Sequence, residues 1–402
     1  MTAMAAKAAG GVAAGAALVA ALAYQCGTFH AHEAASDRPA GAAQPKAAPV
    51  RLIGDGSMAD TGPQPNTFRA ARLAPGQRPP QFVVFSWDGA GEDSNRLFSR
   101  FRSLGARYGA TQTFFLSGLY VLPESQRRRY RPPGRPAGAS SISYLSTASV
   151  RRTLDELRAA WLEGNEIGTH FNGHFCGPSG VGSWSPAQWR SEIRQAKWLV
   201  ANWKTTTGWT AQPPLPFDYG KELIGGRAPC LEGRANLVRA AREMGFRYDS
   251  SGVGRQVWPG KRGGLWDVPM QIVPMPGRHM EVLSMDYNFL ANQSRSPRAR
   301  PANEKQMREG LMRGFRRAYD GNRAPLIIGN HFEDWNGGIY MRAVADVMRD
   351  VCSTPEVQCV SFRNLVDWLD AQDPAVLREL RGLDVGERPE RGWPGAMRSA
   401  DS

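Results

Sequence analysis

The pattern of apolar and polar residues predicts strands and helices in alternation from residue 81 onwards. The run 82–85 is continuously apolar, as in a buried strand, and 93–108 follows it with apolar residues at helical spacing. Ser185 to Gln188 reads as a capping box with proline at the first helical position, which predicts a helix from there to about Thr206. Further strands are expected at 111–116, 166–169, 223–226, 246–249, 265–269, 325–330 and 357–361, and further helices at 149–163, 234–244, 304–319, 339–351 and 364–369.

This alternation indicates a parallel α/β sheet, either open or closed into a barrel. Residues 81–373 are expected to form a single domain, and a unit of that length favours the barrel. Residues 27–80 are rich in Ala, Pro and Gly without sustained periodicity, which predicts a flexible linker. Residues 374–402 are expected to form a polar C-terminal tail with a short helix.

The N-terminus has the pattern of a secretory signal. Lys7 precedes the apolar stretch 8–24, and Ala21-Leu22-Ala23 offers a cleavage site. The stretch is short for a membrane span, so residues 1–26 are predicted to be a signal peptide, with an uncleaved membrane anchor as the alternative. We therefore expect an exported protein, either secreted or anchored at the cell surface.

Composition changes this picture in two ways. The chain of 402 residues carries 50 Lys+Arg and 37 Asp+Glu, a formal charge of +13, yet no nucleic-acid-binding motif is visible. A basic surface also suits an anionic cell wall, so nucleic acid is not expected as a partner. Four of the five cysteines lie in the folded part and suit two disulfides in an exported protein; they are Cys176, Cys230, Cys352 and Cys359.

Two of the six histidines, His170 and His174, stand four residues apart at the end of the predicted strand 166–169. If the chain turns into a helix there, both imidazoles lie on one face and can bind one metal ion. The alternative is two solvated loop histidines. Asp88 follows another predicted strand, and the ends of barrel strands gather at one face, so Asp88 is a candidate third ligand or else a helix cap.

One carboxylate and two imidazoles suit zinc or another first-row divalent metal, with positions left open for water and substrate. His331 follows the buried strand 325–330, which makes it a candidate general acid, with a loop histidine as the alternative. Arg227 stands at a third strand end.

These residues together carry a resemblance. Phe85–Gly89, the His170/His174 pair, Arg227-Ala228-Pro229 and His331 resemble, in order, the motifs of polysaccharide deacetylases, which form carbohydrate esterase family four. The segments 245–251, 265–270 and 322–325 look most like chitin-deacetylase-type members. The resemblance covers roughly residues 81–370.

The resemblance implies a distorted (β/α) barrel of about seven strands and a divalent metal, zinc before others, bound by Asp88, His170 and His174. It implies hydrolysis of N-acetyl groups from an acetylated amino-sugar polysaccharide, with peptidoglycan, chitin and exopolysaccharide all open. In such enzymes a metal-bound water attacks the amide carbonyl, and a histidine, here His331, protonates the departing amine.

The chain departs from the family at Trp87. The family has two aspartates in its first motif, the first acting as base and pairing with the arginine that matches Arg227, and an indole cannot accept a proton. Three explanations compete. First, another carboxylate could supply the base, and the candidates are Glu92, Asp93, Asp267 and Asp286. Second, the metal could activate water with little help. Third, the protein could bind glycan without hydrolysing it. As a function, a metal-dependent esterase also follows from the missing base.

Two further groups follow from the resemblance. Trp335 and Trp266 are candidates for stacking on sugar rings, with packing in the core as the alternative. A Cys176–Cys230 bridge would tie the histidine loop to the neighbouring strand end, and Cys352 and Cys359 form the natural second pair. Zinc ligation by Cys176 is the rival interpretation.

Overall fold

The structure, a computed structural model, describes residues 50–395, so the expected signal or anchor and the linker up to residue 49 lie outside it. Seven parallel strands form the main path of a nine-stranded sheet within the described residues, and β9 (Gly260–Arg262) adds an antiparallel edge. The parallel order is β13 (Leu326–His331), β3 (Gln81–Asp88), β4 (Thr113–Leu116), β5 (Glu166–Thr169), β6 (Gly225–Gly226), β7 (Tyr248–Asp249) and β10 (Leu265–Asp267).

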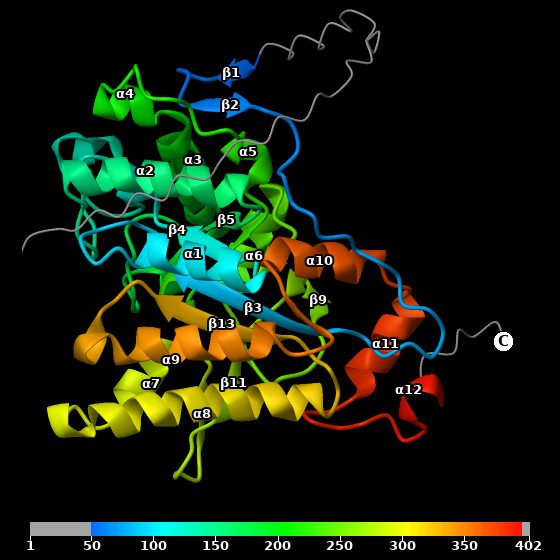
Figure 1. The fold of residues 1–402 in the computed structure, drawn as a ribbon. Helices are drawn as coiled ribbons and strands as arrows, with labels where there is room; N and C mark the ends of the chain where they lie inside the picture. The colour runs from blue at the N-terminus through cyan, green and yellow to red at the C-terminus, as the bar shows by residue number, and fades with distance from the viewer. Residues whose placement is uncertain (1–49, 396–402) are drawn as a thin grey trace, which may run out of the picture. The chain divides into compact units, whose positions relative to one another are not determined.

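A smaller sheet lies next to β13. Its order is β12 (Glu281–Leu283), β11 (Met270–Pro274) and β8 (Val253–Gly254), and a bridge between Met285 and Gly329 joins its end to β13. β14 (Val357–Cys359) extends the main sheet along the start of β3. The sheet therefore curls into a distorted (β/α) barrel of about seven strands, as predicted (Figure 1).

Helices surround the sheet (Figure 1). The expected helix 185–206 begins with the predicted capping box at Ser185 and Gln188 but breaks at Asn202, whose backbone leaves the helical region. The helix expected from residue 304 already begins at Arg300. The larger helices are α1 (Leu97–Tyr108), α2 (Thr147–Leu162), α3 (Pro186–Ala201), α6 (Arg234–Glu243), α8 (Arg300–Tyr319), α9 (Trp335–Cys352) and α10 (Phe362–Ala371), with the short α4 (Trp203–Thr207), α5 (Tyr219–Glu222) and α7 (Asp286–Asn292) between them.

The side chains of β3 alternate between two cores because successive residues of a strand face opposite sides of the sheet. Phe82 and Val84 pack in the barrel interior with the rings of β7 and β10. Val83, Phe85 and Trp87 pack in the layer between sheet and helices. The same alternation turns Ser86 and Asp88 toward the interior at the carboxyl end of the strand.

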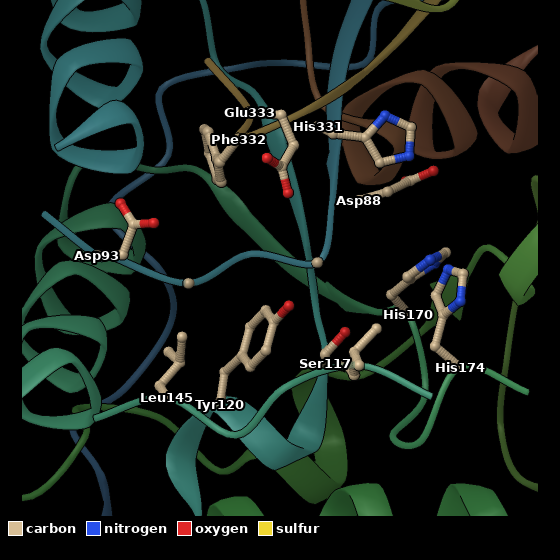
Figure 2. Close-up of a pocket in the computed structure, with 13 residues that line it drawn as sticks. Asp88, Asp93, Ser117, Tyr120, Leu145, His170, His174, His331, Phe332 and Glu333 are labelled. Atoms are coloured by element: carbon tan, nitrogen blue, oxygen red, sulfur yellow. The ribbon is translucent and has the colours of Figure 1, made fainter. Parts of the chain in front are cut away.

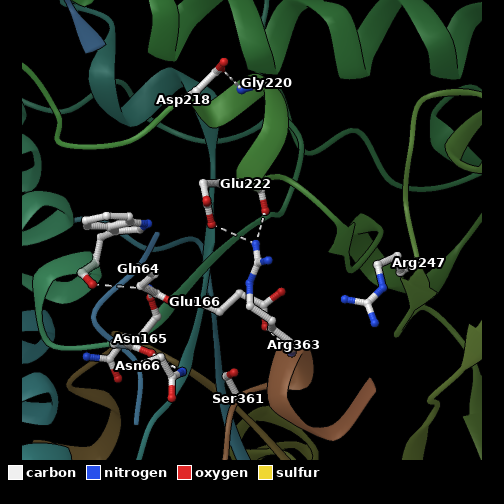
Figure 3. A network of polar contacts seen from close by, with 12 residues as sticks. Gln64, Asn66, Asn165, Glu166, Asp218, Gly220, Glu222, Arg247, Ser361 and Arg363 are labelled. Carbon is white, nitrogen blue, oxygen red and sulfur yellow. Dashed lines mark hydrogen bonds and ion pairs between the residues drawn. The ribbon is translucent and has the colours of Figure 1, made fainter. Parts of the chain in front are cut away.

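The structure differs from the flexible linker expected over 27–80. Residues 51–60 form a hairpin of β1 (Arg51–Ile53) and β2 (Met58–Asp60), and Met58 and Ala59 are buried. The side-chain amide of Gln64 donates to the carbonyl oxygens of Trp161 and Asn165, and that of Asn66 donates to Gly164 (Figure 3). Residues 50–80 therefore pack against the barrel.

Polar groups also fasten α10 to the amino ends of the strands (Figure 3). The buried Glu166 carboxylate accepts from the Thr113 hydroxyl, the Tyr248 hydroxyl and the Arg363 amide. The Arg363 guanidinium pairs with Glu222 at 2.9 Å. This network stabilises the end of the barrel opposite Asp88.

The C-terminal segment from residue 374 contains the expected short helix, but this helix packs against the core instead of lying in a polar tail. α11 (Pro374–Gly382) buries Leu377 and Leu380 against the barrel-interior core, and α12 (Gly392–Gly395) follows. Among the helices of residues 50–395, none combines the length and apolar character needed to cross a membrane.

The packing of residues 50–80 predicts that Met58→Ala lowers the free energy of unfolding by about 3 kcal/mol, because a buried thioether is replaced by a cavity. Leu52→Ala is the matched control, since Leu52 lies on the same hairpin and is 62% exposed; it should change stability by less than about 0.5 kcal/mol. Urea denaturation of both variants measures this. Equal, small effects would mean that the hairpin does not belong to the cooperative fold.

Candidate active site

A cavity of about 160 Å³ opens at the carboxyl ends of β3, β4, β5 and β13. Gly89 lies just after β3 with φ at 70°, a backbone conformation that lets the chain turn away directly after Asp88. The pocket brings together the predicted residues Asp88, His170, His174 and His331 (Figure 2). The sequence-based placement of these four at one face of a barrel is therefore correct.

Arg227 lies beneath the pocket and holds Asp88. Its fully buried guanidinium contacts one Asp88 oxygen at 2.8 Å. The same group donates to the hydroxyls of Ser86 and Ser250 at 3.0 and 2.9 Å. The pKa of Asp88 is below its ordinary value: burial raises it, and the charge of Arg227, followed by those of His170 and His331, outweighs the burial. Asp88 is thus a carboxylate at neutral pH, with one oxygen committed to Arg227.

His170 is oriented by the backbone. Its Nδ1 lies 2.8 Å from the carbonyl oxygen of Arg227. A carbonyl only accepts, so Nδ1 carries the hydrogen and Nε2 keeps its lone pair. Burial lowers the pKa of His170 to about 3, against the opposing effect of Asp88. The ring is therefore neutral, as a metal ligand must be.

His174 lies beside His170, as predicted, but the backbone between them is not the expected helix. Residues 170–176 form a loop, so the helical arrangement expected for the pair is wrong. Phe171 and His174 adopt left-handed backbone conformations, with φ of 61° and 52°, and this turn brings the two imidazoles to 5.0 Å between centroids. Burial also lowers the pKa of His174.

The donor set of Asp88, His170 and His174 fits a divalent first-row metal, because it offers one carboxylate and two neutral imidazoles. Within residues 50–395, a tighter group with ligand atoms within 4.8 Å of one another is His174, Cys176 and Cys230. Its sulfur atoms are joined in a disulfide and supply no thiolate. Asp88, His170 and His174 fall outside that limit, so one metal ion could be bound by all three only if these side chains moved closer together.

His331 is held by Asp286, which was expected as a candidate base. The two Asp286 oxygens accept from the backbone amide and from Nδ1 of His331, at 2.7 and 2.8 Å. Burial alone would lower the pKa of His331, but the Asp286 carboxylate outweighs it and raises the pKa to about 9. His331 is therefore a charged imidazolium at neutral pH, able to donate a proton, and Asp286 is its positioning partner.

The indole of Trp87 faces away from the pocket. It is fully buried, donates from Nε1 to Gln112 at 2.8 Å and stacks on Phe332 at 4.7 Å. Strand alternation explains this, because Asp88 takes the interior face. The position expected for the base thus supplies no group to the cavity.

Most of the carboxylates expected as replacements for the missing base lie outside the pocket. Glu92 accepts from the Ser99 amide at the start of α1, and Asp267 pairs with Arg234 and Arg262. Of the four candidates, Asp93 lines the pocket.

Sequence reasoning missed two polar pocket residues, Ser117 and Tyr120, and gave no role to Glu333, which stands two residues after His331 (Figure 2). The Ser117 hydroxyl is buried and has no hydrogen-bond partner among the described residues. Burial, and then the charges of Glu333 and Asp93, raise the pKa of Tyr120 to about 12. Ser117 and Tyr120 follow β4, so their position after an expected strand was the one available signal.

The two tryptophans expected to stack on sugar rings lie in different parts of the structure. Trp266 is buried in the barrel-interior core and donates from Nε1 to Asp370, which removes it from the site. Trp335 lies 5.4 Å from the ring of His331 and 5.9 Å from that of the exposed Tyr287. Trp335 therefore stays a candidate sugar contact beside the pocket.

Both expected disulfides are present, Cys176–Cys230 and Cys352–Cys359. The first joins the loop that carries His174 to the segment after Arg227.

Asp286→Asn should lower the pKa of His331 in the metal-free protein from about 9, because the largest charge that opposes burial is lost while burial and the smaller effect of Asp88 remain. Histidine NMR titration measures this. Since the folded-state pKa exceeds the unfolded one, the pair stabilises the fold fully below about pH 6.5, and that contribution is lost as pH rises through about 9. Asp346→Asn removes an exposed partner of Arg349 and should leave the midpoint near 9; the same midpoint in Asp286→Asn would contradict the assignment.

Replacing Cys176 and Cys230 together by serine should lower the free energy of unfolding by about 4 kcal/mol, because the bridge closes a long loop. The Cys352/Cys359 double serine variant is the control, with a separation of 7 residues instead of 54 and an expected loss of about 2 kcal/mol. Zinc affinity should fall in the Cys176/Cys230 variant and stay unchanged in the Cys352/Cys359 variant. Equal zinc affinity in the two would show that the first bridge does not position His174.

No family model matches this chain, and no curated protein matches it. Several solved structures are similar to this chain in fold. A candidate polysaccharide deacetylase from Mycobacterium smegmatis is 14% identical with a TM-score of 0.45, over 75% of this chain and 96% of that one. An acetyl xylan esterase of family 4 from Clostridium thermocellum, with a cobalt ion, is 15% identical with a TM-score of 0.38, over 73% and 93%. A carbohydrate esterase family 4 pseudoenzyme from Bacillus anthracis is 10% identical with a TM-score of 0.39, over 76% and 72%.

Proposed function

We propose that the protein is an exported, metal-dependent hydrolase that removes N-acetyl groups from an N-acetylhexosamine polymer. The observation that carries the proposal is the convergence of Asp88, His170, His174 and the imidazolium of His331 on one cavity. Two disulfides fit an oxidising compartment. The polymer, whether peptidoglycan, chitin or exopolysaccharide, is left open.

The size of the cavity supports a small acyl group as the reacting part. At about 160 Å³ it is smaller than the roughly 300–1,000 Å³ that enclose a drug-sized ligand. An acetamido group can enter while the sugar chain lies outside. Trp335 and the exposed Tyr287 lie at the His331 side, where they can contact a sugar ring.

Asp88, His170 and His174 would hold the metal, which when bound polarises the amide carbonyl and acidifies a water molecule. Arg227 keeps Asp88 ionised and fixed, and the Arg227 carbonyl keeps Nε2 of His170 free. His331 donates its Nε2 proton to the amide nitrogen as the C–N bond breaks, so that the amine leaves neutral. Asp286 then stabilises the ring in its charged form for the next turnover.

A second candidate follows from Trp87. Because its indole packs against the helices, the usual base is missing, which favours a protein that binds glycan on this scaffold without hydrolysing it. An esterase is the third candidate, since an ester has a better leaving group and needs less assistance from acids and bases.

With zinc present, the protein should release acetate from N-acetylglucosamine oligomers or peptidoglycan. His331→Ala should lower kcat by about 10²–10⁴, the usual contribution of a general acid. The double variant His170→Ala/His174→Ala should lose both zinc and activity. His279→Ala is the matched control, because His279 is an exposed histidine outside the pocket, and it should retain both.

The outcomes separate the candidates. Acetate release that His331→Ala leaves unchanged would contradict the mechanism. Binding across a glycan panel without acetate release would support the glycan-binding protein. Hydrolysis of aryl acetates with none of N-acetylated glycans would support the esterase.

A further inference from the structure

A proton acceptor is the one group that the proposed reaction still needs. Water must lose a proton as it attacks, and Trp87 faces away from the cavity. Three carboxylates line the pocket: Asp88, Asp93 and Glu333. Asp88 has one oxygen bound to Arg227 and belongs to the metal-binding set. The choice therefore lies between Asp93 and Glu333.

Asp93 is partly committed to its own backbone. One of its oxygens accepts from the Asn95 amide at 2.8 Å and closes a turn before α1. Glu333, by contrast, makes no hydrogen bond or ion pair within residues 50–395. Figure 2 shows its carboxylate directed from the rim into the pocket, facing Ser117 and Tyr120, with Asp93 farther along the wall.

Glu333 is also held in place. His331, two residues before it, is bound to Asp286 through both its backbone amide and Nδ1. Phe332, directly before it, is stacked on Trp87 at an interplanar angle of 6° and packs on Phe98. The tryptophan at the position of the missing base thus supports the segment that presents another carboxylate to the pocket.

The environment of Glu333 suits a base. Burial raises its pKa, against the opposing charge of His331, and the charges of Asp93 and Asp286 add to the increase. A raised pKa brings a carboxylate closer to neutral pH, where general bases work best.

We propose that Glu333 is the catalytic residue that accepts the proton of the attacking water in place of the missing aspartate. The inference rests on the proposed function. Water oxygen bonds to the acetyl carbon and gives one proton to Glu333, while His331 gives its proton to the amide nitrogen. The C–N bond breaks to yield acetic acid and an amine; the acid ionises, and the proton held by Glu333 passes through solvent to restore His331.

Glu333→Gln tests the proposal in the full chain loaded with zinc. It keeps the size of the side chain but cannot accept the proton, so kcat should fall by about 10²–10⁴ with KM within about threefold of the wild type. Glu243→Gln is the matched control, because Glu243 is an exposed glutamate outside the pocket, and it should keep kcat within about threefold. Added formate should restore part of the activity to Glu333→Ala and none to His331→Ala. Full activity in Glu333→Gln would overturn the proposal.

Acetate binding to the zinc-loaded protein gives a readout without turnover. The groups facing Glu333 are His331, Asp93, Asp286 and Tyr120. A bound acetate in the reaction position places a second negative charge beside Glu333, which raises its pKa further and draws in a proton. Calorimetry in buffers of different ionisation enthalpy should show proton uptake near pH 7 for wild type and the Glu243→Gln control. Glu333→Gln should lose that uptake and bind acetate more tightly.

Equal proton uptake in Glu333→Gln and wild type, or failure of the zinc-loaded protein to bind acetate, would overturn the assignment. A wild type that releases no acetate from any glycan, yet shows uptake that depends on Glu333, would instead contradict the proposed function. In that case Glu333 stands as the proton-accepting group of the pocket.

Discussion

The site depends on one buried ion pair, Arg227 with Asp88. β4 and β5 separate β3 from β6, so the pair spans the interior of the barrel, and the contacts of Arg227 with Ser86 and Ser250 add the ends of β3 and β7. Both charges are buried, since their side chains are 0% and 3% exposed, and Asp88 faces only the pocket. Removing one partner of such a pair leaves an uncompensated buried charge, which costs about 3–5 kcal/mol. The strand ends and the ionisation of Asp88 therefore rest on the guanidinium of Arg227, and the direction of the His170 ring rests on the backbone carbonyl of the same residue.

Next to this pair, the tautomer of His170 and the charge of His331 are each determined by a neighbouring group. A backbone carbonyl fixes the tautomer of His170, and Asp286 keeps His331 charged although burial opposes it. The pocket consequently holds neutral imidazoles on one side and an imidazolium on the other. Groups of the same type with pKa values pushed apart by their surroundings are a mark of acid–base chemistry.

Much of this could be predicted from the sequence because strand ends of a parallel barrel share one face. Asp88, His170 and His331 each follow a recognisable apolar run, and the structure brings them together. What could not be predicted depends on the direction of single side chains. The left-handed turn at Phe171 and His174 has no periodic signal. Asp286 could be predicted only as a candidate base, because nothing in the pattern places it against His331. Glu333 stands in a stretch without pattern, and residues 50–80 fold through hydrogen bonds such as those of Gln64, which composition does not reveal.

The most direct test of this account is the position of a metal in the protein itself. Crystals of the zinc-loaded full chain, measured at the zinc absorption edge, would locate the ion by its anomalous signal. The account predicts one strong peak in the pocket, bound by a carboxylate oxygen of Asp88 and by imidazole nitrogens of His170 and His174. A pocket without an anomalous peak at saturating zinc, or a peak bound by other residues, would contradict it.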